Sequence, residues 1–387
     1  MVEWKRIDEV FELRNGYTPS KNISEYWEGG TIPWFRMEDI RQNGGILSDS
    51  IQHITPESVK KSGLFPANTI IVATTATIGE HALVIVDSLA NQRFTALTCR
   101  KSLTQSVLPR FAYYYCFLLD KWCKGHIHQG GFASVDMDGF KKFPFPILPI
   151  SEQNRIVGIL DTFTSSIENL KQQISERRKQ YEHYRDQLLD LEGKEGVEMK
   201  TLGEIGEFIR GNGIKKSDFV DDGFSCIHYG QIHARYGFSA IETISKIEEP
   251  LYKKCKKAKK GDVVLATTSE DTEGVAKPFV WLGDDDAAVS GDAFIYHHNQ
   301  IGKFMGHQFL THKFMQFKIK YATGAKVVRI SGDNMAKYAV ALPSIDEQQR
   351  IVDILDTFEV SIANLEAQLK EREKQYEYYR NKLLTFE

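Results

Sequence analysis

Residues 152–192 read EQNRIVGILDTFTSSIENLKQQISERRKQYEHYRDQLLDLE, and residues 347–387 read EQQRIVDILDTFEVSIANLEAQLKEREKQYEYYRNKLLTFE. The two stretches are offset by 195 residues and are identical at about 26 of 41 positions. Self-similarity at a fixed spacing indicates a repeated structural unit. The chain is therefore one unit of about 195 residues that is used twice.

The beginnings of the two copies follow a similar offset. Val2–Lys5 returns as Val197–Lys200, and Arg14-Asn15-Gly16 is expected to return one residue later, within Arg210–Gly213. The sequence between the repeated ends differs strongly between the copies. The helical segments are therefore alike, whereas the segments before them differ. This pattern is suited to a protein that joins two different globular modules through similar helices.

The repeated stretches have the apolar spacing of a coiled coil. Apolar residues recur in alternating steps of four and three, which is a heptad seam. Helices of about 40 residues are predicted, which would be roughly 60 Å long at 1.5 Å per residue. The seam positions include Ile156, Leu160, Phe163, Ile167, Leu170 and Arg177 in the first copy and Ile351, Leu355, Phe358, Ile362, Leu365 and Arg372 in the second.

One seam position is basic in both copies, at Arg177 and at Arg372. A single polar residue in a seam can fix the register of two helices. The alternative is that these arginines extend to solvent or pair with neighbouring glutamates, and the sequence leaves both readings open. Ser151 and Asp346 are predicted to cap the N-termini of the two helices.

A tandem duplication resembles a dimer whose subunits share one chain. Closed dimers are usually two-fold symmetric, so the helices are predicted to run antiparallel with one module at each end. A parallel arrangement would place both modules at one end and leave an open contact surface.

Each copy also contains a module with a mixed α/β pattern. Short apolar runs rich in β-branched residues predict strands at 69–75, 81–86 and 94–99 in the first module and at 262–268, 279–282 and 294–297 in the second. Helices are predicted at 109–122 and 304–321, each followed by a loop with glycine, at 129–131 and 323–326. The fold class is therefore α+β, with mixed α/β modules at 1–149 and 196–342 and repeated helical segments at 150–195 and 343–387.

The composition, with 42% hydrophobic and 26% charged residues, is that of a globular protein. No apolar run approaches the roughly 18 residues of a membrane helix, and the N-terminus lacks the layout of a signal peptide. The five cysteines are scattered without a C-x-x-C pair, which fits a reducing compartment and predicts no zinc site. We expect a cytoplasmic protein that has no membrane contact.

The formal net charge of −3 hides a division along the chain. The two modules carry +1 and +2, whereas the two helical segments carry −2 and −4. Acidic helices are expected to pack on protein, because nucleic-acid phosphates would repel them. The modules are therefore the parts in which contacts to nucleic acid are expected.

Two corresponding stretches interleave aromatic side chains with polar and basic ones. They read WFRMEDIRQ at 34–42 and HYGQIHARY at 228–236. Arginine and glutamine pair with base edges, and lysine, serine and threonine suit phosphates, although such stretches also occur on ordinary surface loops. The lysine run at 253–260 is either a phosphate footprint or, more commonly, a solvated face.

The sequence contains no motif for chemistry. There is no G-x-x-x-x-G-K-[ST] loop, no G-x-G-x-x-G after a strand and no nucleophile elbow. The histidines have no partners at metal-ligand spacing. We expect no catalytic residue, no metal and no cofactor.

One motif connects the chain to a known family. The pattern L-P-x-S-E-Q-x-R-I-V-x-I-L-D stands at 148–161 and returns, with one inserted residue, at 342–356. The opening G-x-T-P-S-K stands at 16–21, whereas its counterpart at 213–217 lacks the proline. This order of module, motif helix, module and motif helix resembles the specificity subunit of type I restriction–modification systems over essentially the full chain.

The resemblance implies a DNA-binding subunit without catalytic activity. Each module would read one half of a gapped, asymmetric site in double-stranded DNA. The repeated helices would set the spacing and dock two modification (methyltransferase) subunits, which carry S-adenosylmethionine. A separate restriction subunit, a motor-nuclease, would join through the complex.

The candidate DNA-binding side chains lie in the module openings, in the two interleaved stretches and near the ends of the predicted strands. They are Thr18, Lys21, Arg36, Glu38, Arg41, Gln42, Thr75, Thr77, Gln92 and Arg93 in the first module, and Lys215, Lys216, His228, Tyr229, Gln231, His233, Arg235, Thr268, Ser269, Lys326 and Arg329 in the second.

Two other classes of protein remain as alternatives. One is a coiled-coil scaffold or adaptor with two globular domains, and the other is a fused methyltransferase–nuclease. The missing cofactor motifs disfavour the enzyme, and the divergence of the two modules disfavours a symmetric scaffold. Neighbouring genes for an adenine methyltransferase and a helicase-like nuclease would distinguish the three.

Overall fold

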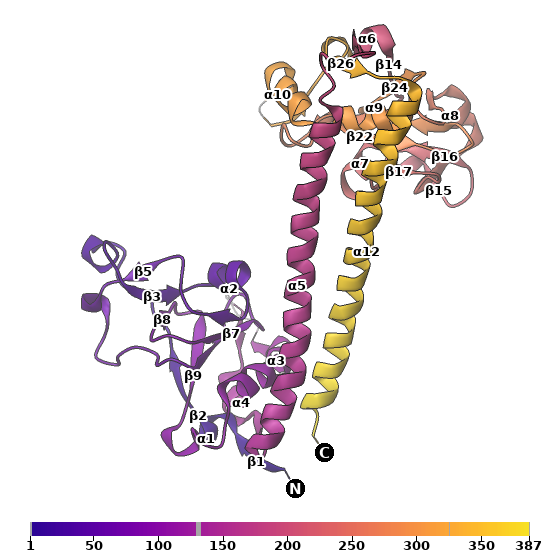
Figure 1. Ribbon diagram of the computed structural model, residues 1–387. Coiled ribbons are helices and arrows are strands. Elements are labelled where there is room, and N and C mark those ends of the chain that lie inside the picture. Colours follow the sequence, from indigo (N-terminus) through magenta and orange to yellow (C-terminus); the bar gives the residue numbers. More distant parts are fainter. Residues whose placement is uncertain (1, 129–132, 325, 387) are drawn as a thin grey trace. The chain divides into compact units, whose positions relative to one another are not determined.

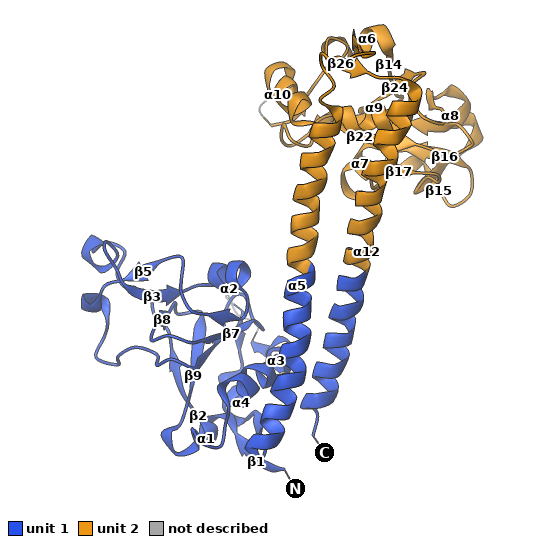
Figure 2. Ribbon diagram, in the orientation of Figure 1, with its two compact units in different colours: residues 1–170, 368–387 blue, residues 171–367 orange. Residues whose placement is uncertain are grey.

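The structure is a computed structural model that describes residues 2–128, 133–324 and 326–386 (Figure 1). The predicted glycine loop at 129–131 and one residue of the loop at 323–326 lie outside the described residues. The chain forms two compact units, here called the first unit, Met1–Leu170 with Gln368–Glu387, and the second unit, Lys171–Ala367 (Figure 2).

The first unit contains twelve of the named strands and about half of the first long helix. Its strands are β1 (Glu3–Arg6), β2 (Phe11–Asn15), β3 (Ile32–Phe35), β4 (Ile46–Leu47), β5 (His53–Ile54), β6 (Thr69–Ala73), β7 (His81–Val84), β8 (Leu89–Ala90), β9 (Phe94–Cys99), β10 (Ile127–His128), β11 (Ser134–Val135) and β12 (Pro144–Ile147). Its helices are α1 (Ile7–Val10), α2 (Met37–Asn43), α3 (Pro109–Gly125), α4 (Met137–Lys142) and the beginning of α5 (Ile150–Leu189), with 3₁₀ turns at Ser24–Tyr26, Pro56–Ser58 and Lys101–Leu103.

The second unit repeats this plan. Its strands are β13 (Glu198–Thr201), β14 (Gly206–Arg210), β15 (Phe219–Val220), β16 (Phe224–Ile227), β17 (Ser239–Ala240), β18 (Ser245–Ile247), β19 (Lys257–Ala258), β20 (Val263–Ala266), β21 (Thr268–Ser269), β22 (Lys277–Trp281), β23 (Ala287–Val289), β24 (Ala293–His298), β25 (Val328–Arg329) and β26 (Ala339–Leu342). Its helices are α6 (Leu202–Ile205), α7 (Tyr229–Ala234), α8 (Glu249–Lys254), α9 (Gly302–Gln308), α10 (His312–Tyr321), α11 (Gly332–Met335) and the beginning of α12 (Ile345–Leu384), with a 3₁₀ turn at Lys216–Asp218.

A five-stranded sheet forms the centre of each module. The strand orders are β2-β9-β6-β7-β4 in the first unit and β14-β24-β20-β22-β17 in the second. All neighbours are antiparallel except the edge pairs β4–β7 and β17–β22, which are parallel. The mixed α/β modules that the sequence predicted are confirmed, and most expected strands match an observed one within a few residues.

The sheet is buried on both faces, which explains why its central strands are continuously apolar. Successive side chains of a strand point to opposite faces. Ile70 and Val72 of β6 accordingly join the core that contains α3 and α5, while Ile71 and Ala73 join the core that contains Trp34 and Phe35. Strand β20 divides its residues between two cores in the same way.

The long helices begin by packing on their own modules. Ile156 and Leu160 of α5 are 0% exposed and belong to the core of the first unit. Ile351 and Leu355 of α12 occupy the same place in the second unit. The first seam positions of each helix therefore dock the helix on its module.

The glutamine of the repeated motif fastens the start of each long helix. Gln153 is 0% exposed, its Oε1 accepts from the Leu108 amide at 2.9 Å, and its Nε2 donates to the carbonyls of Ser106 and Leu148 at 2.7 and 2.8 Å. The corresponding bonds of the buried Gln348 involve Ile301, Gln300 and Pro343. A buried amide with such partners fixes where the helix meets the module.

Within the second unit, α5 and α12 run antiparallel. Arg178 pairs with Glu366 at 2.5 Å, the Tyr181 hydroxyl donates to Glu359 at 3.1 Å, and the ring of Tyr184 lies on that of Phe358, with centroids 5.5 Å apart. Rising numbers in α5 therefore meet falling numbers in α12. The antiparallel helix pair is confirmed, and both helices have the predicted length of 40 residues.

The basic seam position has an aromatic partner in the first unit. The Arg372 guanidinium lies 5.7 Å from the centroid of the Phe163 ring, which in turn stacks on Tyr379 at 5.4 Å. Its counterpart Arg177 is half-buried. A role of these arginines in register stays a prediction.

Two local predictions were wrong. Ser151 and Asp346 lie inside the first turn of their helices, and the side chain that caps α12 is Ser344, whose Oγ accepts from the Glu347 amide at 3.3 Å. The helix predicted over 304–321 is two helices, because the Thr311 hydroxyl accepts from the Phe314 amide at 3.2 Å and starts a new helix there.

Candidate nucleic-acid interface

Several strand ends meet at one edge of the first unit. Strand β9 begins at Phe94, next to the ends of β2 and β6, because Asn15 pairs with Thr95 and Ala73 pairs with Phe94. Strands β3 and β8 run parallel and end side by side, with Phe35 opposite Ala90. The segments that follow these strands therefore leave the module from one edge.

Four backbone hydrogen bonds join these segments in the first unit, and four equivalent bonds recur in the second. We call each set the strand-end frame. In the first unit the amides of Gly16, Tyr17, Thr74 and Asn91 donate to the carbonyls of Phe94, Ala90, Arg93 and Phe35 at 2.9, 2.9, 2.9 and 3.0 Å. In the second unit the amides of Gly211, Asn212, Thr267 and Ser290 donate to the carbonyls of Ala293, Val289, Asp292 and Ile227 at 3.0, 2.9, 3.0 and 3.0 Å.

A glycine is required at one place in each frame. A Cβ on Gly16 would lie 2.2 Å from the Asn91 oxygen and 2.3 Å from the Ala90 oxygen. A Cβ on Gly211 would lie 2.2 and 2.5 Å from the corresponding oxygens of Ser290 and Val289. These distances are far shorter than any van der Waals contact, so only glycine allows the backbone to approach so closely.

The strand-end frames give a different alignment of the two copies from the one that the sequence suggested. Gly16 corresponds to Gly211, which is the offset of 195 residues, and Arg210 corresponds to Asn15. The expected shift by one residue was wrong. The match of Arg14 with Arg210 is a coincidence of residue type, because the two arginines occupy different positions of the strand.

In the first unit, the frame brings together several predicted DNA-binding residues. The Thr18 hydroxyl donates to the Gln92 amide oxygen, although these residues are 74 positions apart in the sequence. Arg36 follows β3 directly and pairs with Glu38 at 3.9 Å, and Arg41 pairs with Glu80 at 3.6 Å. Three further candidates, Lys21, Gln42 and Arg93, are exposed, and Thr75 and Thr77 are partly exposed.

Sequence reasoning missed the residue that orients Arg36. Asp39 is 0% exposed, and its carboxylate accepts from the amides of Arg36 and Ile51, both at 2.6 Å. An aspartate three residues after the start of a helix is a capping signal, and this spacing could have identified it.

In the second unit, three predicted DNA-binding residues are engaged within the protein. His228 caps α7 by accepting from the Gly230 amide at 3.2 Å, and its pKa is lowered by burial. The Gln231 amide donates to the Ser245 hydroxyl at 2.6 Å, and the His233 ring bonds the Thr268 carbonyl at 2.9 Å. These contacts place the helix that follows β16 but leave fewer of its side chains free to reach a ligand.

The other predicted residues of the second unit, apart from the buried Thr268, lie nearer the surface. Thr268 pairs with Arg329 across the β21–β25 ribbon, so two candidates that are 61 positions apart become neighbours. The exposed candidates are Lys215, Lys216, Arg235, Lys326 and Arg329, and Tyr229 and Ser269 are partly exposed. That any of these side chains contacts DNA stays a prediction.

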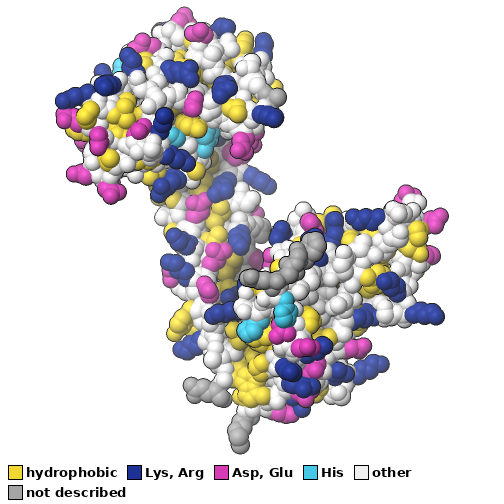
Figure 3. All heavy atoms as spheres, turned by 180° about the vertical axis from the view of Figure 1, so that it is seen from behind, with side chains coloured by type: hydrophobic (Ala, Val, Ile, Leu, Met, Phe, Trp, Pro, Cys, Tyr) yellow, Lys and Arg dark blue, Asp and Glu magenta, His cyan; other side chains and the backbone are white. Residues whose placement is uncertain are grey.

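The lysine run at 253–260 contains two ion pairs. Lys253 pairs with Glu249 at 2.8 Å and Lys260 with Asp284 at 2.7 Å, while Lys257 lies 4.7 Å from the centre of the Tyr252 ring. Figure 3 likewise shows Lys and Arg side chains interspersed with Asp and Glu on the visible face of each unit. The run is therefore partly neutralised.

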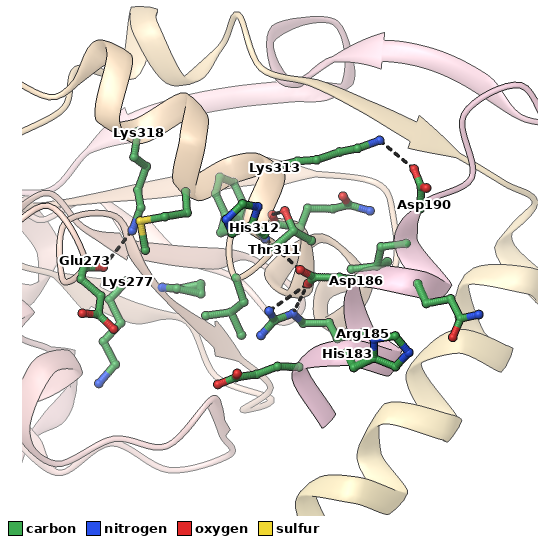
Figure 4. Close-up of a pocket in the computed structure, with 18 of the residues that line it drawn as sticks. His183, Arg185, Asp186, Asp190, Glu273, Lys277, Thr311, His312, Lys313 and Lys318 are labelled. Carbon is green, nitrogen blue, oxygen red and sulfur yellow. Dashed lines mark hydrogen bonds and ion pairs between the residues drawn. The ribbon is translucent and has the colours of Figure 1, made fainter. Parts of the chain in front are cut away.

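The second unit contains a cavity of about 940 Å³ between the end of α5 and helices α9 and α10 (Figure 4). Arg185 and Asp186 form an ion pair at 2.8 Å on one wall. On another wall, the Lys318 ammonium donates to the backbone carbonyls of Glu273 and Val275 at 2.8 and 2.9 Å. These bonded groups have structural roles, whereas the buried Nε2 of Gln308, which also lines the cavity, has no hydrogen-bond partner among the described residues.

Two histidines of the second unit, the buried His307 and the half-buried His298, favour the neutral form. Burial lowers the pKa of His298 to about 4 and that of His307 to about 3. In the unfolded chain a histidine titrates near about 6.5, so the unfolded state binds more protons between the two values. The free energy of unfolding is therefore highest above pH 6.5 and decreases as the pH falls toward 3.

We expect the second unit to lose stability on acidification by at most about 1.4 kcal/mol per pH unit for each of these histidines. Thermal unfolding between pH 7.5 and 4.5 measures this loss. His307→Gln should flatten the pH dependence, whereas His183→Gln, at an exposed position of α5, should not. Equal slopes for both variants and the parent would contradict the assignment.

Within the described part of the chain, no group of three or more His, Cys, Asp or Glu side chains could hold a metal ion. No helix among the described residues is long and apolar enough to cross a membrane.

Comparisons with known proteins give the family. The chain is 48% identical over 236 residues to the specificity subunit of the type I restriction enzyme EcoprrI from Escherichia coli, and 33% identical over 263 residues to that of EcoR124I/EcoR124II from the same organism. These alignments cover 57% and 64% of this chain. They span only 58% and 63% of the two relatives, which is less than two thirds of their lengths.

A longer alignment and two solved structures extend over the whole chain. A putative type I specificity subunit from Haemophilus influenzae is 25% identical over 418 aligned positions, which cover 100% of this chain and 96% of the relative. The S subunit of a type I restriction-modification system from M. genitalium has a TM-score of 0.54, with 17% identity and coverage of 100% and 97% of the two chains. A chain from the structure that describes complex assembly and conformational transition of the type I R-M system has a TM-score of 0.65, with 17% identity and coverage of 99% and 96%, so both structures share the fold.

The family model described as the type I restriction modification DNA specificity domain matches residues 1–177 and again residues 194–374. The two matches follow the internal repeat and the two strand-end frames. The chain therefore belongs to the family of type I restriction modification DNA specificity proteins.

Proposed function

We propose that this chain is the DNA sequence-recognition subunit of a type I restriction–modification complex. Each module, at residues 1–149 and 196–342, reads one half of a gapped, asymmetric site in double-stranded DNA. The repeated helical segments, at 150–195 and 343–387, set the spacing between the halves and dock two modification subunits. The restriction subunits join through the complex, which works in the cytoplasm.

The observation that carries this proposal is the pair of strand-end frames. Both frames consist of backbone groups and have the same four hydrogen bonds. The side chains near the two frames differ, with Thr18, Arg36 and Gln92 in one unit and Lys215, Tyr229 and Arg329 in the other. Two equal frames with unequal side chains are suited to reading two different half-sites, because sequence is read by side chains at base edges.

The chain is proposed to have no catalytic activity of its own. The absence of nucleotide- and cofactor-binding motifs from the sequence supports this role. The two buried glutamines of the repeated motif, Gln153 and Gln348, have structural partners. Methyl transfer and cleavage are then the work of the partner subunits.

The test combines the purified chain with modification subunits of a relative. We expect the assembled complex to methylate DNA at one gapped site, and the chain alone to transfer no methyl group from labelled S-adenosylmethionine. Binding should weaken steeply with salt, because contacts to phosphates release counterions. Methyl transfer by the chain alone, or methylation without sequence preference, would contradict the proposal.

A further inference from the structure

Lys318 is an unusual residue of the second unit. It lies on α10, is 3% exposed, and has no carboxylate ion pair in the described part of the structure. Its ammonium instead donates to two backbone carbonyls, that of Glu273 at 2.8 Å (Figure 4) and that of Val275 at 2.9 Å. Burial of a lysine without a direct ion pair is unfavourable, and the nearby charges of Glu273 and Asp271 offset this only in part, so the fold retains Lys318 against a cost.

The two carbonyls belong to a loop that leaves the strand-end frame. The loop begins at Ser269, the last residue of β21, runs to Val275 and returns to the sheet at Ala276, whose amide donates to the Ala266 carbonyl at 2.8 Å. Within it, the Asp271 carboxylate accepts from the Gly274 amide at 2.6 Å. Lys318 holds the last part of this loop, directly before Ala276.

The backbone at the end of the loop is strained. Ala276 has a φ of 55°, in the left-handed region that disfavours residues with a Cβ. The residue at the same place in the first unit is Gly79, with a φ of 81° and an amide that also returns to its central strand, at Ala73. Glycine adopts this conformation without strain, so at this position only the second unit is strained. The first unit has its left-handed alanine earlier in the loop, at Ala76 with a φ of 64°.

A lysine from a helix later in the chain lies near the loop in both units. In the first unit, Lys124 of α3 lies against Gly79, since a Cβ there would be 2.4 Å from the Lys124 Cε. In the second unit, the ammonium of Lys318 instead donates to the carbonyls of Glu273 and Val275, which lie just before Ala276. The contact with the loop is therefore a repeated feature, and its hydrogen bonds are specific to the second unit.

The loops differ in charge. Residues 75–79 of the first unit carry no charged side chain, whereas the loop of the second unit carries Glu270, Asp271 and Glu273. Asp271 is used within the loop, and Glu270 is exposed. A carboxylate repels phosphates but accepts hydrogen bonds from the exocyclic amino group of cytosine in the major groove.

We propose that Lys318 is a positioning residue that fixes the loop Ser269–Val275, so that Glu270 accepts from an exocyclic amino group of a base in the half-site of the second module. This inference rests on the proposed DNA-recognition function. It assigns to that half-site a base with an amino group at the major-groove edge, and it makes Lys318 a determinant of specificity that does not touch DNA.

The experiment maps methylated sites for the complete complex with Lys318→Met. We expect discrimination at one base of the second half-site to fall by about ten-fold, as for loss of one good base contact, and the first half-site to stay unchanged. Glu270→Gln should alter the preference at the same base. Lys320→Met, at an exposed position two residues further along α10, is the control and should leave both half-sites unchanged.

A second variant keeps the test decisive if Lys318→Met unfolds the module. Ala276→Gly removes the left-handed strain, and the double variant Ala276→Gly with Lys318→Met should regain the folded state and part of the lost discrimination. Unchanged discrimination in folded Lys318→Met, or an effect of Glu270→Gln at a different base, would overturn the inference. A parent complex without any sequence preference would instead overturn the proposed function.

Discussion

A complex in which residues 196–342 are replaced by the corresponding module of a relative will methylate sites with one new half and one retained half. The exchanged segment contains one complete strand-end frame, and the other frame lies entirely between Gly16 and Phe94. No side chain of the retained frame changes. Because each mismatched base pair costs about 1–3 kcal/mol, a change of about three bases alters the preference between sites by at least about a hundred-fold.

Sequencing of methylated DNA from cells that carry the hybrid measures this result. The reciprocal exchange of residues 1–149 is the matched control and should alter the other half of the site. Changes in both halves after either exchange would mean that the two modules read DNA jointly. A hybrid that methylates the parental site would place recognition outside the modules.

Ile351→Asp will detach the second long helix from its module. Ile351 is 0% exposed in the core of the second unit, next to the buried Leu355 and Val352. The substitution leaves a cavity and forces a carboxylate to lose its hydration without a partner, so the free energy of unfolding should fall by about 4 kcal/mol or more. The measurement is thermal or denaturant unfolding of the second unit together with the yield of assembled complex.

Val360→Asp provides the control for this variant. Val360 lies on the same helix but is 59% exposed, so an aspartate there stays hydrated. We expect its effect to lie within about 0.5 kcal/mol of the parent. Similar losses for both variants would show that the apolar core around Ile351 is not what holds the helix.

Periodicity and repetition made the helices and the division into two modules predictable. The seam spacing depends only on the sequence of the helix itself, and α5 and α12 accordingly have their expected lengths. The short capping signals were harder to interpret, because Ser344 competes with Asp346 and because Thr311 interrupts an apolar pattern that continues on both sides. In each case one side-chain hydrogen bond decides where the helix begins.

The candidate interface depends on contacts between distant segments. The sequence alone does not place Thr18 beside Gln92 or Thr268 beside Arg329. These residues become neighbours only when segments that are distant in the sequence pair in the folded chain. Gln231 is likewise buried in the folded chain, although nothing in the sequence distinguishes it from an exposed polar residue. The resemblance to a family supplied the function, and the tertiary structure was needed to place the residues.

The first unit contains residues from both ends of the chain, and this has a consequence for how the protein is synthesised. Leu384 is 1% exposed within the core that also contains Ile7 and Phe111, and Leu383 and Phe386 pack against it. A ribosome that has made the first module must therefore add more than two hundred further residues before this core can close. Until then the nascent first module presents an unfilled apolar site, so the module that is translated first is completed last.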